Sequence, residues 1–166
     1  HEDGGPAFYS QERIGKNEKP FKMWKFRSMV VNADQMIDQL EDQNEINGAM
    51  FKIKDDPRIT KIGHTIRKYS LDELPQLWNV LIGDMSLVGP RPPLPSEVEE
   101  YTDYDKQRLL VMPGCTGLWQ VTKRNEADFD EMVWLDIVYI NHSGILEDLK
   151  LIIKTIGVVI HPNGAY

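Results

Sequence analysis

Two adjacent carboxylates, Asp72 and Glu73, are the residues of this sequence best suited to carry chemistry. Neighbouring residues of a helix point about 100° apart, so one carboxylate can attack a substrate while the other holds a metal ion. Pro75 lacks a backbone N–H and predicts a kink directly after the pair. Because Arg67 and Lys68 stand just upstream, this kinked helix start is suited to an anionic substrate.

The same segment also has a purely structural interpretation. Ser70 and Glu73 have the spacing of a capping box, in which the two side chains satisfy backbone N–H groups at a helix start. Acidic residues in a first turn also interact favourably with the helix dipole. Spacing alone favours this structural interpretation, and the residues by themselves leave both the structural and the catalytic interpretation open.

Two other basic segments could bind phosphate. Four prolines within residues 89–95 predict a stiff extended loop that carries Arg91. Stiffness reduces the entropy lost when the planar guanidinium grips a phosphate. Lys25 and Arg27 stand together near the end of a predicted hairpin. The structural alternatives are a rigid connector for the loop and a solvated strand edge for the hairpin end.

Several other kinds of chemistry lack their sequence signatures. The chain has no glycine-rich dinucleotide fingerprint, no P-loop and no Gly-x-Ser-x-Gly segment. Its four histidines show no metal-ligand spacing with one another or with Cys115. As the single cysteine, Cys115 cannot form an internal disulfide. The formal net charge of -7 argues against a nucleic-acid-binding surface.

The secondary structure expected to position these residues begins with a β-hairpin. Residues 7–14 and 21–27 have strand-like spacing on either side of turn residues 15–20, and a phase shift at Trp24 indicates a bulge. A lone hairpin is barely stable in water, so we expect it to pack on helices.

Helices are expected for most of the remaining chain. Apolar residues at helical spacing predict helices over residues 32–46, 59–66, 74–81, 96–111, 128–141 and 146–160. Asn32 should cap the first helix, Gly83 should end the third, and Ser96 with Glu99 forms a capping box for the fourth. The predicted fold class is therefore α+β, mostly helical, as one domain over residues 1–166.

Five ordered motifs give the sequence a family resemblance. The motifs are Lys25-Phe26-Arg27-Ser28-Met29, the run 56–63 (DPRITKIG), the run 67–77 (RKYSLDELPQL), the run 83–92 (GDMSLVGPRP) and the run 114–121 (GCTGLWQV). In this order the chain closely resembles the bacterial sugar transferases, which are monotopic phosphoglycosyl transferases acting on polyprenol phosphate. The resemblance covers nearly the whole chain.

This resemblance implies a reaction. The enzymes move a sugar 1-phosphate from a UDP-sugar to undecaprenyl phosphate and release UMP, at the cytoplasmic face of the bacterial membrane, to start glycan assembly. By resemblance, Asp72 is a nucleophile that forms a phosphosugar-aspartate intermediate, and Glu73 helps to bind Mg²⁺. Arg67 and Arg91, with Lys25 and Arg27 as further candidates, would hold phosphates.

The membrane expectation also rests on the resemblance. Family members carry an apolar re-entrant segment just upstream of the hairpin, so we interpret this chain as a catalytic domain without that segment. No apolar run in it reaches the roughly 20 residues that span a bilayer. Amphipathic helices lying in the membrane interface would then make the membrane contact, with residues 59–66 and 146–160 as candidates. The alternative for residues 146–160 is a core helix.

Two other functions remain as alternatives. One is a non-catalytic membrane-surface assembly module, which predicts that Asp72 and Glu73 are solvated and point away from Arg91. The other is a Mg²⁺-dependent nucleotide-sugar hydrolase, which predicts turnover without a lipid acceptor. The sequence does not identify the sugar, although UDP-glucose is the donor we expect, and it leaves the oligomeric state open, a homo-oligomer included.

Overall fold

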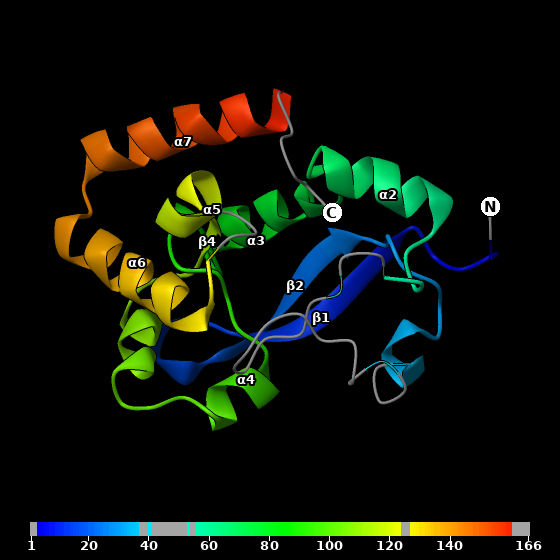
Figure 1. The fold of residues 1–166 in the computed structure, drawn as a ribbon, viewed down its shortest axis with the longest axis horizontal. Helices are drawn as coiled ribbons and strands as arrows, with labels where there is room; N and C mark the ends of the chain where they lie inside the picture. The colour runs from blue at the N-terminus through cyan, green and yellow to red at the C-terminus, as the bar shows by residue number, and fades with distance from the viewer. Residues whose placement is uncertain (1–2, 37–39, 41–52, 54–55, 124–126, 161–166) are drawn as a thin grey trace.

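A computed structural model describes residues 3–36, 40, 53, 56–123 and 127–160 of the chain (Figure 1). It begins with an antiparallel hairpin in which β1 (Phe8–Ile14) pairs with β2 (Pro20–Phe26). The register runs without interruption from Phe8 opposite Phe26 to Ile14 opposite Pro20. The predicted hairpin is therefore confirmed, whereas the predicted bulge at Trp24 is wrong.

The hairpin packs on a helix through one buried amide. Asn79 of α3 (Gln76–Ile82) is fully buried, and its side chain bridges the backbone of β2. Its Oδ1 accepts from the N–H of Trp24 at 3.0 Å, and its Nδ2 donates to the carbonyl of Lys22 at 2.8 Å. Because these backbone groups lie on the edge of the hairpin away from β1, the amide takes the place of a third strand.

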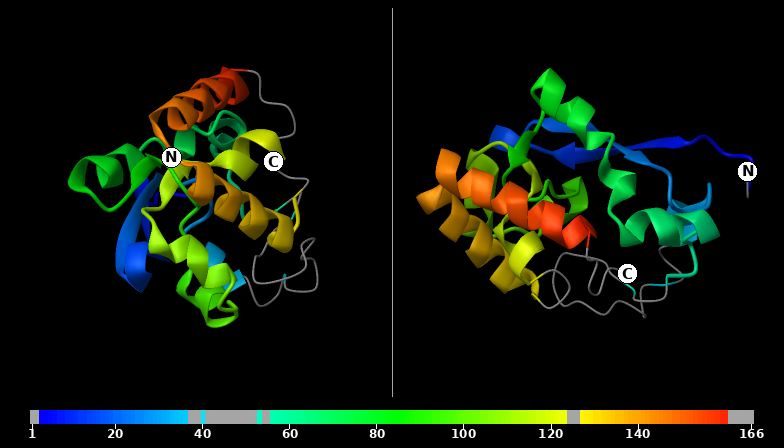
Figure 2. Two further views of the ribbon diagram at one scale, coloured as in Figure 1. Left: turned by 90° about the vertical axis from the view of Figure 1, so that its left-hand side faces the viewer. Right: turned by 90° about the horizontal axis from the view of Figure 1, so that it is seen from above.

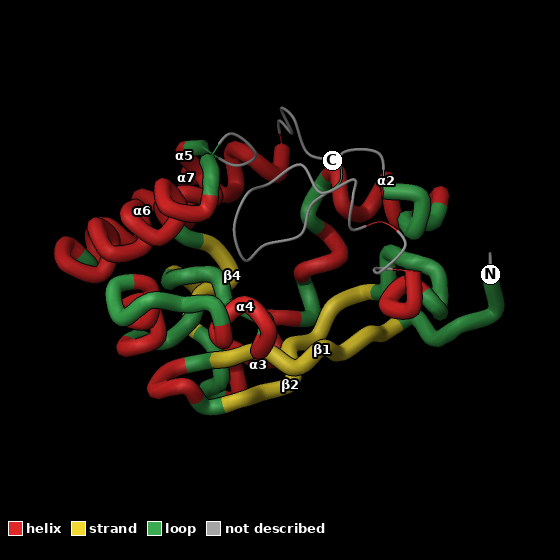
Figure 3. Tube along the Cα trace, turned by 60° about the horizontal axis from the view of Figure 1, so that its bottom comes forward, coloured by secondary structure: helices red, strands yellow, loops and turns green. Residues whose placement is uncertain are grey.

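The other elements are short and mostly helical, so the predicted α+β class is confirmed. In chain order they are the 3-10 turns η1 (Lys16–Glu18) and η2 (Ala33–Met36), α2 (Lys61–Lys68), η4 (Leu71–Glu73), α3, β3 (Ser86–Val88), α4 (Pro95–Glu99), η5 (Asp105–Leu110), β4 (Gly114–Thr116), α5 (Leu118–Thr122), α6 (Phe129–His142) and α7 (Ile145–Ile160). Figure 3 shows the hairpin on one side of the molecule, with α2 and α5 to α7 on the other.

The helix predictions have mixed outcomes. The predictions over 59–66, 128–141 and 146–160 correspond to α2, α6 and α7. The helix predicted over 74–81 begins two residues later, and Gly83 ends it in a left-handed conformation, as expected. Most of the helix predicted over 32–46 lies outside the described residues, and its described start is the 3-10 turn η2.

The single helix predicted over 96–111 is wrong, because local caps divide the segment into α4 and η5. A carboxylate oxygen of Glu97 accepts from the N–H of Leu94 at 2.8 Å and caps α4. A carboxylate oxygen of Asp105 accepts from the N–H and hydroxyl of Thr102 at 2.8 and 2.7 Å, which starts η5. The capping box predicted from Ser96 and Glu99 does not form there.

A parallel pairing of β3 with β4, which the sequence did not predict, brings two motifs together. Ser86 lies opposite Gly114 and Val88 opposite Thr116. A Cβ on Gly114 would lie only 2.1 Å from the nitrogen of Gly89, so the two backbones can approach only because Gly114 has no side chain. The stiff loop that carries Arg91 is thereby held beside the segment that leads into α5.

Two helices expose apolar side chains that the core does not use. Helix α3 buries Gln76 and Asn79 while its leucines and Trp78 face outward, and Trp78 is 56% exposed. Helix α7 buries Leu151 and exposes a row of aliphatic side chains that includes Leu149 and Ile153. Figure 2 shows α3 projecting from one side of the molecule and α7 lying across the top. Within the described residues, no helix has the length and apolar character to cross a membrane.

The contact between α2 and the end of the hairpin can be tested at Gly63. A Cβ on Gly63 would lie 2.0 Å from the carbonyl oxygen of Ser28, so Gly63→Ala should destabilise the fold by about 1–3 kcal/mol. The matched control is Gly157→Ala in α7, where a Cβ meets nothing within 4 Å and should stabilise the helix by up to about 1 kcal/mol. Urea unfolding of both variants measures the difference, and a Gly63→Ala protein as stable as wild type would contradict the packing described here.

Candidate active site

A separate 3-10 turn, η4, holds the two adjacent carboxylates. It follows α2 at Ser70, whose φ of 53° is left-handed and whose N–H donates to the carbonyl of Arg67 at 2.9 Å. Pro75 then separates η4 from α3. The break predicted beside the acids is present, but the capping box is not, because the Ser70 side chain caps nothing.

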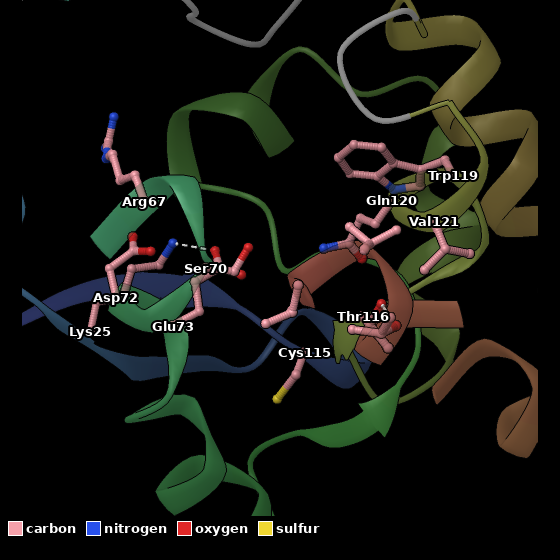
Figure 4. A pocket seen from close by; sticks show the side chains of 13 residues that line it. Lys25, Arg67, Ser70, Asp72, Glu73, Cys115, Thr116, Trp119, Gln120 and Val121 are labelled. Carbon is pink, nitrogen blue, oxygen red and sulfur yellow. Dashed lines mark hydrogen bonds and ion pairs between the residues drawn. The ribbon is translucent and has the colours of Figure 1, made fainter. Parts of the chain in front are cut away.

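The carboxylate of Asp72 is buried, with 6% of the residue exposed. Burial and the neighbouring charge of Glu73 raise the pKa of Asp72, while Lys25 and Arg67 act in the opposite direction. Burial also acts to raise the pKa of Glu73, but the charge and hydrogen bond of Lys25 oppose it, and the net shift is downward. The Lys25 Nζ lies 2.8 Å from the Glu73 Oε1, an ion pair drawn in Figure 4. The two neighbouring acids are therefore electrostatically distinct, a common arrangement in catalytic sites.

A first cavity of about 300 Å³ opens on one side of these acids. Figure 4 shows Asp72, Glu73 and Lys25 on one wall, Trp119 and Gln120 on the opposite wall, and Cys115 with Thr116 between them. Helix α7 closes the cavity with Thr155, Val158 and Val159. Burial raises the pKa of the Cys115 thiol to about 11, so this thiol is not an activated nucleophile at neutral pH.

A second cavity of about 290 Å³ is also lined by Asp72 and is rich in cations. Its basic lining residues are Arg13, Lys25, Arg27, Arg58, Arg67 and Arg91. Arg58 is paired with Asp56 at 2.6 Å, Arg27 with Asp3 at 2.6 Å and Lys25 with Glu73 at 2.8 Å, so these three cations already have carboxylate partners. Arg91 lies at the longer distance of 3.5 Å from Glu97.

Three residues, Lys25, Arg67 and Asp72, line both cavities. Asp72 is therefore at the junction of the two spaces, together with two cations, Lys25 from the hairpin and Arg67 from α2. Arg67 is oriented by its Nε, which donates to the hydroxyl of Ser28 at 3.0 Å. A phosphorus atom placed at this junction would have a carboxylate nucleophile and two cations within the same lining.

The structure brings together all six residues singled out from the sequence. Asp72, Lys25, Arg67, Arg91 and Arg27 line the second cavity, and Glu73 lines the first. Arg27 is the least available of them for binding a phosphate, because it also donates to the carbonyls of Pro6 at 2.6 Å and Met29 at 2.9 Å.

Among the lining residues that sequence reasoning missed are Arg13, Trp119 and Gln120. Trp119 and Gln120 belong to the motif 114–121, so the motif itself was the available signal. Arg13 has no such signal, because an arginine on a hairpin strand ordinarily faces solvent.

Asp72 and Glu73 also fit a divalent cation that binds together with a phosphate substrate. Mg²⁺ is commonly bound by one or two carboxylates plus substrate phosphates rather than by a cage of protein ligands. Within the described residues, no group of three or more acidic, histidine or cysteine side chains could hold a metal ion alone. Burial and the charge of Glu73 raise the pKa of Asp72, and a bound cation would act in the opposite direction.

Comparison with known proteins gives a consistent result. Residues 1–162 match the family model described as bacterial sugar transferase. The chain is 55% identical over 164 residues to a galactosyl transferase, CpsE, of Streptococcus agalactiae, covering 98% of this chain and 36% of that protein. It is 48% identical over 168 residues to the undecaprenyl-phosphate galactose phosphotransferase of Salmonella typhimurium, covering 99% of this chain and 35% of that protein.

Shorter relatives are covered more completely. The exopolysaccharide production protein ExoY of Sinorhizobium fredii is 42% identical over 168 residues, which cover 99% of this chain and 74% of that protein. The chain thus spans about a third of the length of the first relatives and about three quarters of this one.

The charges around Asp72 can be tested without reference to a reaction. Lys25→Met removes a cation that lowers the pKa of both acids, so the pKa of Asp72 and that of Glu73 should rise. Carboxyl ¹³C NMR titration measures both values. Lys22→Met on the same strand is the matched control and should leave them unchanged, and a Lys25→Met protein with unchanged pKa values would contradict this electrostatic arrangement.

Proposed function

Because the chain belongs to the bacterial sugar transferase family, we propose that it transfers a sugar 1-phosphate from a UDP-sugar to undecaprenyl phosphate and releases UMP. The name of the Salmonella relative supports undecaprenyl phosphate as acceptor. The observation that carries the proposal is the position of Asp72, a buried carboxylate between one cavity and a second, cation-lined cavity.

In the first half-reaction, a carboxylate oxygen of Asp72 attacks the β-phosphorus of the donor. A bond forms between that oxygen and phosphorus, and the bond from phosphorus to the bridging oxygen breaks. UMP leaves with the electron pair, and the sugar phosphate stays on Asp72 as an acyl phosphate. A diphosphate repels an anionic nucleophile, so the cations of Lys25 and Arg67 are needed to neutralise the developing charge.

In the second half-reaction, a phosphate oxygen of undecaprenyl phosphate attacks the same phosphorus atom. The bond to Asp72 breaks, and its carboxylate is regenerated without net gain or loss of a proton. In-line displacement requires both the departing UMP and the arriving lipid phosphate to lie opposite Asp72. One cationic site then serves both phosphates in turn, which predicts ping-pong kinetics.

Glu73, beside Asp72, would hold Mg²⁺ together with the diphosphate oxygens. The ion would supply positive charge that stabilises the phosphoryl group during transfer. The depressed pKa of Glu73, maintained by Lys25 against the effect of burial, keeps this ligand ionised.

This function also requires contact with the membrane, because the acceptor's polyprenyl chain is apolar. The exposed Trp78 and Leu81 of α3, together with the aliphatic row of α7, support contact with the lipid interface. Ile62 of α2 is also 60% exposed and is a further candidate for contact with lipid. We therefore propose that these helices lie in the cytoplasmic interface of the bacterial membrane.

The alternatives differ in measurable ways. An assembly module requires solvated acids remote from Arg91, whereas Asp72 is buried and lines a cavity with Arg91. A hydrolase would release UMP without a lipid acceptor, whereas a transferase requires undecaprenyl phosphate for steady turnover. The donor sugar, for which UDP-glucose is our expectation, stays a prediction to be tested with a panel of UDP-sugars.

The covalent step can be tested by labelling. The protein in cell membranes, incubated with a UDP-sugar carrying ³²P in the β-phosphate, should become labelled when no acceptor is present. Asp72→Asn should abolish labelling because an amide is a poor nucleophile, and Asp103→Asn, an exposed control, should not. Persistent labelling of Asp72→Asn would place the nucleophile elsewhere.

The membrane surface can be tested with two tryptophans of similar exposure. Trp78 on α3 is 56% exposed and Trp134 on α6 is 53% exposed. Trp78→Ser should weaken flotation with anionic phospholipid vesicles by about tenfold or more, because it removes a large amphipathic ring from the proposed interface. Trp134→Ser should bind as wild type does. Equal loss in both variants, or none in Trp78→Ser, would contradict the proposed orientation.

A further inference from the structure

The two cavities that meet at Asp72 differ sharply in chemistry. Apart from the three shared residues, Glu73 is the single charged side chain among the described residues that line the first cavity. The second has four further arginines and two further acids, Asp34 and Glu97, so cations are in excess there. Each cavity is at the lower end of the usual size range of small-molecule sites, about 300–1,000 Å³. A donor that contains a nucleoside, two phosphates and a sugar is therefore accommodated better by the two together than by either alone.

The far wall of the first cavity has the groups that recognise a neutral polyol. Trp119 offers an indole ring, and Gln120 offers an amide that points into the cavity (Figure 4). The Nε1 of Trp119 and the Oε1 of Gln120 are buried and make no hydrogen bond within the described part of the chain. Buried polar atoms are destabilising when they stay unpaired. A sugar hydroxyl can accept from the indole and donate to the amide, and Gln120, only partly buried, can turn to meet it.

The second cavity contains a buried cation with no carboxylate partner among the described residues. Arg13 is 6% exposed, and its hydrogen bonds go to neutral oxygens, the carbonyl of Pro92 at 3.2 Å and the Oε1 of Gln11 at 2.8 Å. Its Nε has no hydrogen-bond partner in the part of the chain that the structure describes. Burial and the charge of Arg91 lower the pKa of Arg13 to about 10, which still leaves it charged at neutral pH. A buried, unpaired charge is costly, so this arginine is suited to an anionic ligand.

We propose that the donor straddles Asp72, with its sugar in the first cavity against Trp119 and Gln120 and its nucleotide in the second cavity beside Arg13 and Arg91. The β-phosphate then lies at the junction, between Lys25 and Arg67. This placement rests on the proposed function, and it follows from charge: the α-phosphate goes to the arginines and the uncharged sugar to the neutral wall. Arg13 and Gln120 thereby gain separate roles in binding, one for the nucleotide and one for sugar choice.

The test uses two variants and two readouts in the complete membrane protein. Calorimetric titration with UMP measures nucleotide binding, and kcat/KM for a panel of UDP-sugars measures sugar choice. Gln120→Leu should lower the preference for the best sugar over the next by about tenfold or more and leave the UMP affinity within twofold. Arg13→Gln should weaken UMP binding about tenfold or more and leave the ranking of sugars unchanged.

Two controls guard against a folding defect. Gln107→Leu, an exposed site on η5, should change neither readout. Arg13→Lys keeps the charge, so it should bind UMP more tightly than Arg13→Gln, and it replaces Arg13→Gln if that variant fails to fold.

The proposal is overturned if Gln120→Leu weakens UMP binding, if folded Arg13 variants change the sugar ranking but not UMP affinity, or if both readouts stay as in wild type. A wild-type protein that transfers no sugar phosphate from any UDP-sugar would instead contradict the proposed function. Calorimetry with UMP would then still decide whether Arg13 binds the nucleotide.

Discussion

The central constraint in this structure is a buried carboxylate placed next to a second carboxylate. Removing Asp72 from water beside Glu73 disfavours its ionised form, and the positions of Lys25 and Arg67 offset part of that cost. A nucleophilic carboxylate must be ionised and poorly hydrated at the same time. The two acids, Asp72 and Glu73, and the two cations, Lys25 and Arg67, therefore form one electrostatic unit.

The rest of the fold positions this unit from three directions. The hairpin supplies Lys25, and the Asn79 bridge fixes the hairpin on α3. Helix α2 supplies Arg67 and is held against Ser28 by a glycine contact that leaves no room for a side chain. The left-handed backbone at Ser70 then turns the chain so that Asp72 and Glu73 face the space between these elements.

Local signals predicted the parts of the fold that depend on neighbours in sequence. Strand alternation predicted the hairpin, the helical spacing of apolar residues predicted α6, and Gly83 predicted the end of α3. Contacts between distant segments were not predictable in this way. The pairing of β3 with β4 depends on two glycines meeting from separate motifs, and the helix over 96–111 was broken by caps at Leu94 and Thr102. Arg13 was missed for the same reason, since only the fold shows that it is buried.

The central proposal is that Asp72 carries the sugar phosphate during turnover. The most direct measurement is mass spectrometry of the protein, quenched after incubation with a UDP-sugar in the absence of acceptor and digested with pepsin at low pH. We expect one added sugar phosphate on the peptide that contains Asp72, and we expect this modification to disappear on addition of undecaprenyl phosphate. Modification of a different residue, or transfer to the lipid with no modified peptide at any time, would contradict it.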